Sequence, residues 1–171
     1  RAQPFPPLNG VLGPGGERWA PVHGMMQLSL AATVFEAIEA VFCEMAGDFD
    51  RLGIHIGYLF STLSTNALII EPVFYWPEAH TEVHAVAVEP KYLAKLPKLP
   101  PNPEATALVT AARKKVIAVY QRFGCGHLQI GRTYPYKASR DPASVDLLNC
   151  IHRTLDPDGI INPGVLGLDP Q

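Results

Sequence analysis

The run IHIGYLFSTLSTNALIIEPVFYW, residues 54–76, decides the fold of this chain. Its first part alternates apolar residues with more polar ones, and this period of two predicts a strand with one buried face. Residues 61–66 indicate a turn, and residues 68–76 indicate a second strand that is apolar on both faces. The two segments therefore predict a β-hairpin. Pro72 predicts an edge position or a bulge, because proline cannot donate to a ladder.

Helices are expected on both sides of this hairpin. Before it, residues 31–50 carry an apolar stripe at helical spacing, with Thr33 and Glu36 at capping-box spacing, Ser29 as an alternative cap, and Gly47 or Gly53 at the end. After it, Asn102 and Pro103 start a helix over residues 103–123.

Short strands are expected outside these helices, over residues 18–25 and at Leu128-Gln129-Ile130. Pro21 indicates an edge or a bulge in the first of them. The order becomes β-α-β-β-α-β, which predicts an α+β, ferredoxin-like antiparallel sheet with both helices on one face.

Three further segments surround this unit. Residues 1–17 are rich in proline and glycine, and residues 1–15 are expected to be a linker. Residues 77–101 are expected to be irregular, a long connection of a kind that is often functional. Residues 137–171 are expected to be a C-terminal tail with a helix over 142–155, which Asp141 caps and Pro142 starts.

Bulk composition bounds the class of protein. The 171 residues are 47% hydrophobic and carry a formal net charge of -2, which gives no electrostatic case for nucleic acid or an anionic membrane. No stretch approaches the roughly 20 apolar residues of a membrane span. The three cysteines form no CxxC pair and are expected to be small buried hydrophobes in a reducing compartment, the cytoplasm. The first residue is Arg1, and we expect the chain to be part of a longer protein.

Few residues form recognisable chemical motifs. The chain has no P-loop, no GxGxxG turn and no GxSxG elbow, so kinase and hydrolase chemistry are unsupported. His80 and His84 have a metal-ligand spacing only if they share a helix, and the β-branched residues around them disfavour a helix. No metal site is therefore expected.

A polar cluster at residues 127–136 is the best candidate site. Arg132 lies near Tyr134 and Tyr136 in a segment fixed by glycine and proline, and a guanidinium beside two phenols can bind a carboxylate or phenolate. The alternative is a surface arginine with two half-buried tyrosines. Both interpretations fit these residues taken alone.

The tail adds a longer pattern. Leu155-Asp156-Pro157-Asp158-Gly159-Ile160-Ile161-Asn162-Pro163-Gly164 follows the last helix, and an ordinary helix stop with two turns also explains it. With Gly131-Arg132-Thr133 and Trp19-Ala20-Pro21-Val22, it resembles the C-terminal part of the FAD-linked oxidases of the vanillyl-alcohol oxidase, 4-cresol dehydrogenase and D-lactate dehydrogenase superfamily. The resemblance covers residues 16–168, and Gly131 stands where the phenol-binding members have tyrosine.

This resemblance implies a substrate or cap domain over residues 16–136 and a tail that returns toward a missing N-terminal FAD-binding domain. Arg132, Tyr134 and Tyr136 are then implied as catalytic residues, and Asn162 and Arg132 as contacts of the FAD. Gly16, Glu17 and Arg18 occupy the region of the flavin-linking histidine, so no covalent link is expected here.

The implied reaction is oxidation of a small-molecule alcohol by hydride transfer to flavin. The substrate is a 2-hydroxy acid such as lactate or glycolate, or a 4-alkylphenol, and the chain alone is expected to be inactive. The alternative is a non-catalytic ferredoxin-like module that binds a ligand or partner. The sequence leaves the oligomeric state open, a homo-oligomer included.

Overall fold

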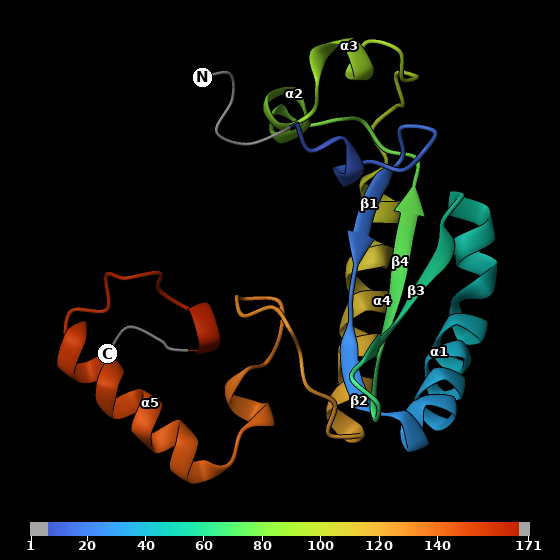
Figure 1. Ribbon diagram of the computed structural model, residues 1–171. Helices are drawn as coiled ribbons and strands as arrows, with labels where there is room; N and C mark the ends of the chain where they lie inside the picture. Colours follow the sequence, from blue (N-terminus) through green and yellow to red (C-terminus); the bar gives the residue numbers. More distant parts are fainter. Residues whose placement is uncertain (1–6, 168–171) are drawn as a thin grey trace.

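The computed structural model describes residues 7–167 and is an α+β arrangement of an antiparallel sheet with two long helices, α1 and α4 (Figure 1). The predicted hairpin is present as β3 (His55–Leu63) and β4 (Ala67–Trp76). Its strands pair from His55↔Tyr75 to Leu63↔Ala67, so the turn is shorter than expected and contains Ser64 with φ of 58°.

The outer strand beside β4 is broken into β1 (Arg18–Pro21) and β2 (Gly24–Gln27). Both pair with β4 in one continuous register, from Arg18↔Trp76 to Gln27↔Ala67, so Val22 and His23 stand opposite Pro72 and Glu71. The break follows from the sequence, because Pro72 has no N–H to return the hydrogen bond that it accepts from Val22 N–H.

Pro72 itself corrects our expectation of an edge or a bulge. It lies in β4, the central strand, where it is buried between Val22 on one side and Tyr58 on the other. Only one ladder hydrogen bond is lost there, and the loss falls where the neighbouring strand is already interrupted.

Helices α1 (Ala31–Leu52) and α4 (Pro103–Arg122) pack together against the sheet. The expected capping box of α1 is wrong: the 3-10 turn Leu28–Leu30 leads into the helix, and no side chain caps it. Gly53 ends α1 in the left-handed conformation that glycine favours. Asn102 caps α4 as expected, its side chain accepting from Ala105 N–H.

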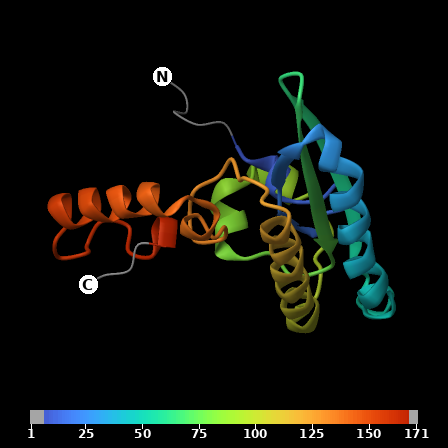
Figure 2. The same ribbon diagram turned by 90° about the horizontal axis from the view of Figure 1, so that it is seen from below.

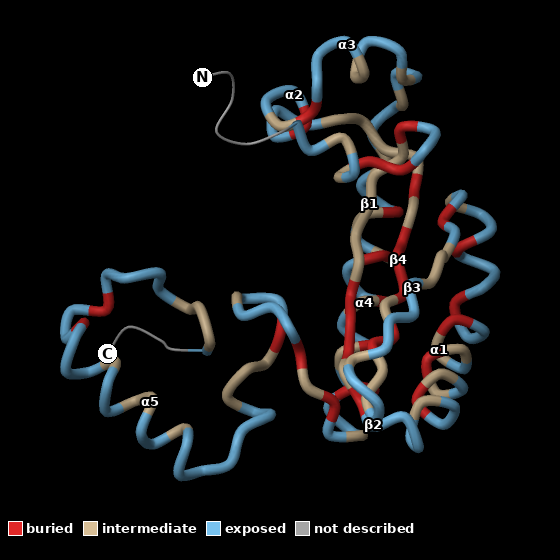
Figure 3. Tube along the Cα trace, viewed as in Figure 1, coloured by how far each residue is buried: buried red, intermediate tan, exposed pale blue. Residues whose placement is uncertain are grey.

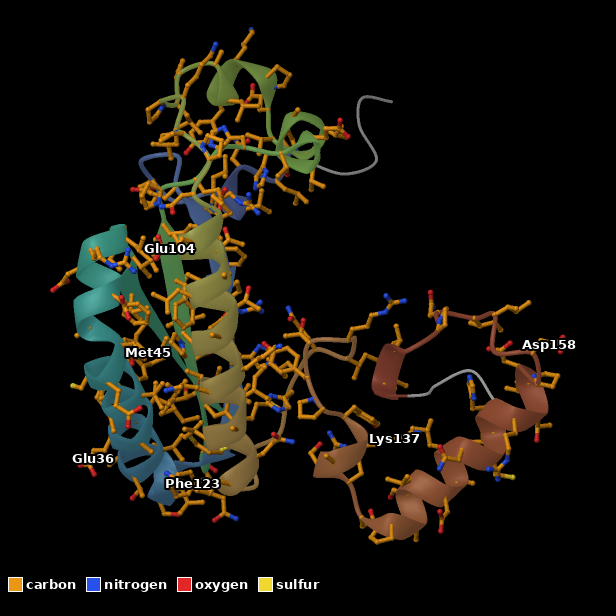
Figure 4. All side chains as sticks on the ribbon, turned by 180° about the vertical axis from the view of Figure 1, so that it is seen from behind. Glu36, Met45, Glu104, Phe123, Lys137 and Asp158 are labelled. Atoms are coloured by element: carbon orange, nitrogen blue, oxygen red, sulfur yellow. The ribbon has the colours of Figure 1, made fainter. Side chains whose placement is uncertain are left out.

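The core lies between these helices and one face of the sheet. Figure 3 shows buried residues along β2 and β4, in the break between β1 and β2, and on the inner sides of α1 and α4. Alternate residues of β4, Ile70, Phe74 and Trp76, join helix residues such as Met45, which lies among the side chains between the helices in Figure 4. The opposite face of the sheet has no helix packed on it among the described residues.

Residues 77–101 are less irregular than expected. They contain α2 (Glu82–Ala87) and α3 (Pro90–Leu93) at one end of the sheet, beside the 3-10 turn Asn9–Val11 (Figure 1). His84 lies in α2 despite the β-branched residues around it. The Thr81 hydroxyl and the His84 ring form a reciprocal cap that stabilises this single turn and a half.

The expected strand at Leu128-Gln129-Ile130 is wrong. Only one bridge, Met25↔Gly126, joins this part of the chain to the outer strand, and all three residues are exposed. The reason lies in the side chains of residues 127 and 134, which take the hydrogen bonds that a strand would use.

The tail follows as the 3-10 turn Lys137–Ser139, α5 (Pro142–Leu155) and the 3-10 turn Val165–Gly167. Asp141 caps α5 and Pro142 starts it, as expected. Figure 2 shows α5 extending away from the sheet and its two helices. No helix within residues 7–167 combines the length and the apolar character that crossing a membrane requires.

Candidate functional site

The uncovered face of the sheet has a polar group at its centre. The register aligns side chains from β3, β4 and the outer strand in rows across this face. The middle row consists of Leu59, Glu71 and His23. The rows on either side hold apolar or small residues: Gly57, Val73, Pro21, Ser61, Ile69 and Met25.

Glu71 is the only carboxyl group in β4. Burial among these apolar neighbours raises its pKa above the ordinary value, because a charged carboxylate is poorly solvated there. A half-buried carboxyl whose pKa is raised by burial marks a candidate functional site.

His23 lies opposite Glu71 in a network of buried polar groups. Its Nε2 accepts a hydrogen bond from Leu128 N–H at 2.9 Å, so a neutral His23 carries its proton on Nδ1. That Nδ1–H donates to the Tyr134 hydroxyl at 2.9 Å, and the His23 backbone N–H donates to the same oxygen at 3.1 Å. The neutral tautomer is consistent with a lowered pKa of His23, caused first by burial and then by His127.

His127 completes this network. Its Nδ1–H donates to the His23 carbonyl at 2.9 Å, which leaves the Nε2 lone pair buried and without a partner among the described residues. Its ring stacks on Tyr134 with centroids 4.4 Å apart. His127 and Tyr134 thus occupy the backbone N–H and C=O of His23, and this displaces the expected strand at 128–130.

Tyr134 has a distinct chemical state. Its oxygen accepts two hydrogen bonds from His23, so both lone pairs are used and the hydroxyl proton is free to donate to a ligand. Burial raises its pKa, while the backbone N–H of His23 and the nearby Arg113 act in the opposite direction. Arg113 reaches the same region from α4, donating to the Pro21 carbonyl at 3.0 Å.

The remaining predicted residues form a second group, on the tail. Arg132 is exposed and donates to the Pro163 carbonyl at 2.6 Å, and Leu166 N–H donates to the Gly131 carbonyl at 3.3 Å. Asn162 has φ of 46° in the same turn. The structure therefore brings Arg132 together with the Asn162-Pro163-Gly164 turn.

Tyr134 and Tyr136 are separated in role. Tyr134 is 5% exposed and belongs to the histidine network. Tyr136 is half-buried and lies under the Arg140 guanidinium, 4.6 Å from its ring centroid. A pocket of about 370 Å³ lies between α4 and the tail, and Lys114, Arg132, Tyr134 and Gly164 are among its lining residues.

Sequence reasoning missed His23 and Glu71, whereas His127 lies inside the predicted polar cluster at residues 127–136. The partnership of His23 with His127 could not be predicted, because residues 104 apart in the chain give no spacing signal. Glu71 had a signal: it is a single charge inside a strand that is otherwise apolar on both faces. Within residues 7–167, no group of three or more histidine, cysteine or acidic side chains could hold a metal ion, and His80 contacts the Gly16 carbonyl.

Comparison with protein-family models, with curated proteins and with solved structures finds no match to this chain.

Proposed function

We propose that this chain is the substrate domain and tail of an FAD-dependent oxidoreductase that oxidises an alcohol. The observation that carries the proposal is Glu71, a carboxyl with a raised pKa at the centre of an uncovered sheet face. The sequence resemblance to the vanillyl-alcohol oxidase superfamily supports the same function. The three cysteines are all free, the state expected in a reducing compartment such as the cytoplasm. Only Cys125 is buried, so the expectation of buried cysteines is wrong for Cys43 and Cys150, which are exposed.

The proposal includes a ferredoxin-like topology. The outer strand, broken into β1 and β2, is then the first strand of a βαββαβ unit, and the single bridge at Gly126 is what remains of the last. The order of pairing, with β4 between the outer strand and β3, supports this assignment.

The open face fits a planar cofactor ring better than it fits a dinucleotide tail. The apolar residues Val73, Ile69 and Met25 flank Glu71 on this face, whereas no glycine-rich phosphate loop occurs in the sequence. We infer that most of the FAD is held by a preceding domain, and that Asn162 and Arg132 approach it from the tail. The flavin, when bound, would accept a hydride from the substrate carbon.

The residues of this chain then have separate tasks. Glu71 takes the hydroxyl proton as the alcohol becomes a carbonyl, because its raised pKa brings it closer to neutral pH. His23 cannot take that proton without losing the bond from Leu128 N–H, so it holds Tyr134 in place. Tyr134 can donate its free proton to the substrate oxygen, and Arg132 would bind the anionic group of a 2-hydroxy acid or a phenolate.

The test uses the full-length protein with flavin bound, mixed without oxygen with lactate, glycolate or a 4-alkylphenol. Bleaching of the flavin absorbance by one of these substrates is expected. Glu71→Gln should slow it by roughly 10²- to 10⁴-fold, the range for loss of a general base. Glu36→Gln is the matched control, since Glu36 is exposed on α1 (Figure 4). Equal rates in the two variants would remove Glu71 from the reaction.

A further inference from the structure

The outer side of β3 is a bare strand edge. Within residues 7–167, β3 pairs only with β4, and five of its nine residues are exposed. From Leu52 to Ile70 the sequence contains no Asp, Glu, Lys, Arg or proline. Soluble proteins usually protect a long edge with charges, proline or a bulge, because an unprotected edge pairs with another strand.

The hydrogen-bond pattern of the sheet decides which backbone N–H and C=O groups of β3 point outward from this edge. Val22 N–H bonds to the Pro72 carbonyl, so even-numbered residues of β4 bond toward the outer strand and odd-numbered ones toward β3. In the β3 to β4 register, odd residues of β3 face odd residues of β4. The even residues of β3 therefore direct their backbone N–H and C=O groups outward: Ile56, Tyr58, Phe60 and Thr62.

We propose that β3 pairs antiparallel with β3 of a second copy of this chain, about a two-fold axis at Leu59. In this register Ile56 meets Thr62 of the second copy and Tyr58 meets Phe60. Every outward-directed residue then faces another outward-directed residue, so about eight backbone hydrogen bonds form across the axis.

The side chains are complementary in this register. Leu59 and Phe60 are 52% and 51% exposed, which is high for large apolar groups in the middle of a strand. Pairing covers both: Leu59 meets its own copy on the open face, and Phe60 meets Tyr58 on the helix side, where the two rings already stack within one chain. No charged residue of β3 opposes another.

Helix α1 leaves room for the second copy. Phe35 and Glu39 of α1 contact Tyr58, whereas Glu44 and Arg51 reach residues of α4. The flank of α1 beside β3 therefore continues through Cys43 and Ala46, one and two turns after Glu39, and both are small and exposed. Beside the axis this flank carries Phe35 and Glu39, and Cys43 and Ala46 keep its continuation small.

The register gives a direct test by disulfide cross-linking. Leu59→Cys is made in a chain that also carries Cys43→Ser and Cys150→Ser, since those two cysteines are exposed. Directly opposed residues have Cβ atoms about 4.5–5.5 Å apart, close to what a disulfide needs. Under mild oxidation we expect a covalent dimer from Leu59→Cys. Ser61→Cys, on the same face, should stay monomeric, because its two copies would lie about 14 Å apart along the strands.

Sedimentation of the 171-residue chain at tens of micromolar gives the second measurement. The wild type and Val86→Lys, a control at an 88% exposed residue of α2, are expected to be dimers. Thr62→Pro removes one outward N–H without touching the β4 ladder, and should give a monomer with native circular dichroism. A monomeric wild type, a dimeric Thr62→Pro, or equal cross-linking at positions 59 and 61 would overturn the proposal.

Discussion

Replacing Tyr134 by phenylalanine should destabilise the fold through His23. The variant keeps the ring that stacks on His127 but removes the oxygen that accepts from His23 N–H and Nδ1–H. Both donors are then buried without a partner, and each stranded donor costs about 1–3 kcal/mol. We expect the free energy of unfolding to fall by at least about 2 kcal/mol.

Urea denaturation followed by tryptophan fluorescence measures this loss. With a slope of roughly 2 kcal/mol per molar urea, the midpoint should fall by about 1 M at unchanged slope. Tyr136→Phe is the matched control, and should change stability by no more than about 0.5 kcal/mol. Hydrogen exchange at Leu128 N–H should also quicken in Tyr134→Phe, because that amide bonds to His23. Equal midpoints for the two variants would refute the assigned network.

Three further predictions follow from other contacts. The pKa values of His23, His84 and His127 are all lowered, with burial the first cause in each, so the unfolded chain binds their protons at higher pH. The stabilisation that comes from keeping these histidines neutral is therefore complete above about pH 6.5. As the pH falls below that value, the free energy of unfolding should decrease by up to about 1.4 kcal/mol per pH unit for each histidine. A urea midpoint that stays constant between about pH 7.5 and 5.5 would contradict this prediction. Glu78→Ala should destabilise the start of α4 by about 1–3 kcal/mol in urea, because Glu78 accepts from Asn102 N–H, Thr106 and Trp76, while Glu89→Ala should have little effect. Under the proposed function, Arg132→Ala in the full-length protein should lower kcat/KM about 10- to 150-fold with little change in Tm, and Arg132→Lys should restore it in part. Unchanged kinetics would assign Arg132 only to the Pro163 contact.

The local elements were predictable because each rests on contacts within its own segment. The alternation in 54–60 and the apolar run to Trp76 gave the hairpin, and Asn102-Pro103 and Asp141-Pro142 gave the starts of α4 and α5. These signals are short-range: a cap and its amide lie three residues apart, and a strand period needs only its own side chains. The same locality explains why the cap of α1 was missed, since the turn before it has no side-chain signature.

Long-range pairing was decided only by the tertiary structure. A central Pro72 is tolerated because its nitrogen, which carries no hydrogen, faces the break between β1 and β2. That break is at Val22, 50 residues away in the chain. The last strand was lost because two side chains, from His127 and Tyr134, satisfy the backbone of His23 in place of a strand. Glu71 and His23 meet only through the register of β4 with the outer strand. Sequence periodicity states which face a residue takes, but which residues share that face depends on strand pairing, and that is settled when the whole sheet forms.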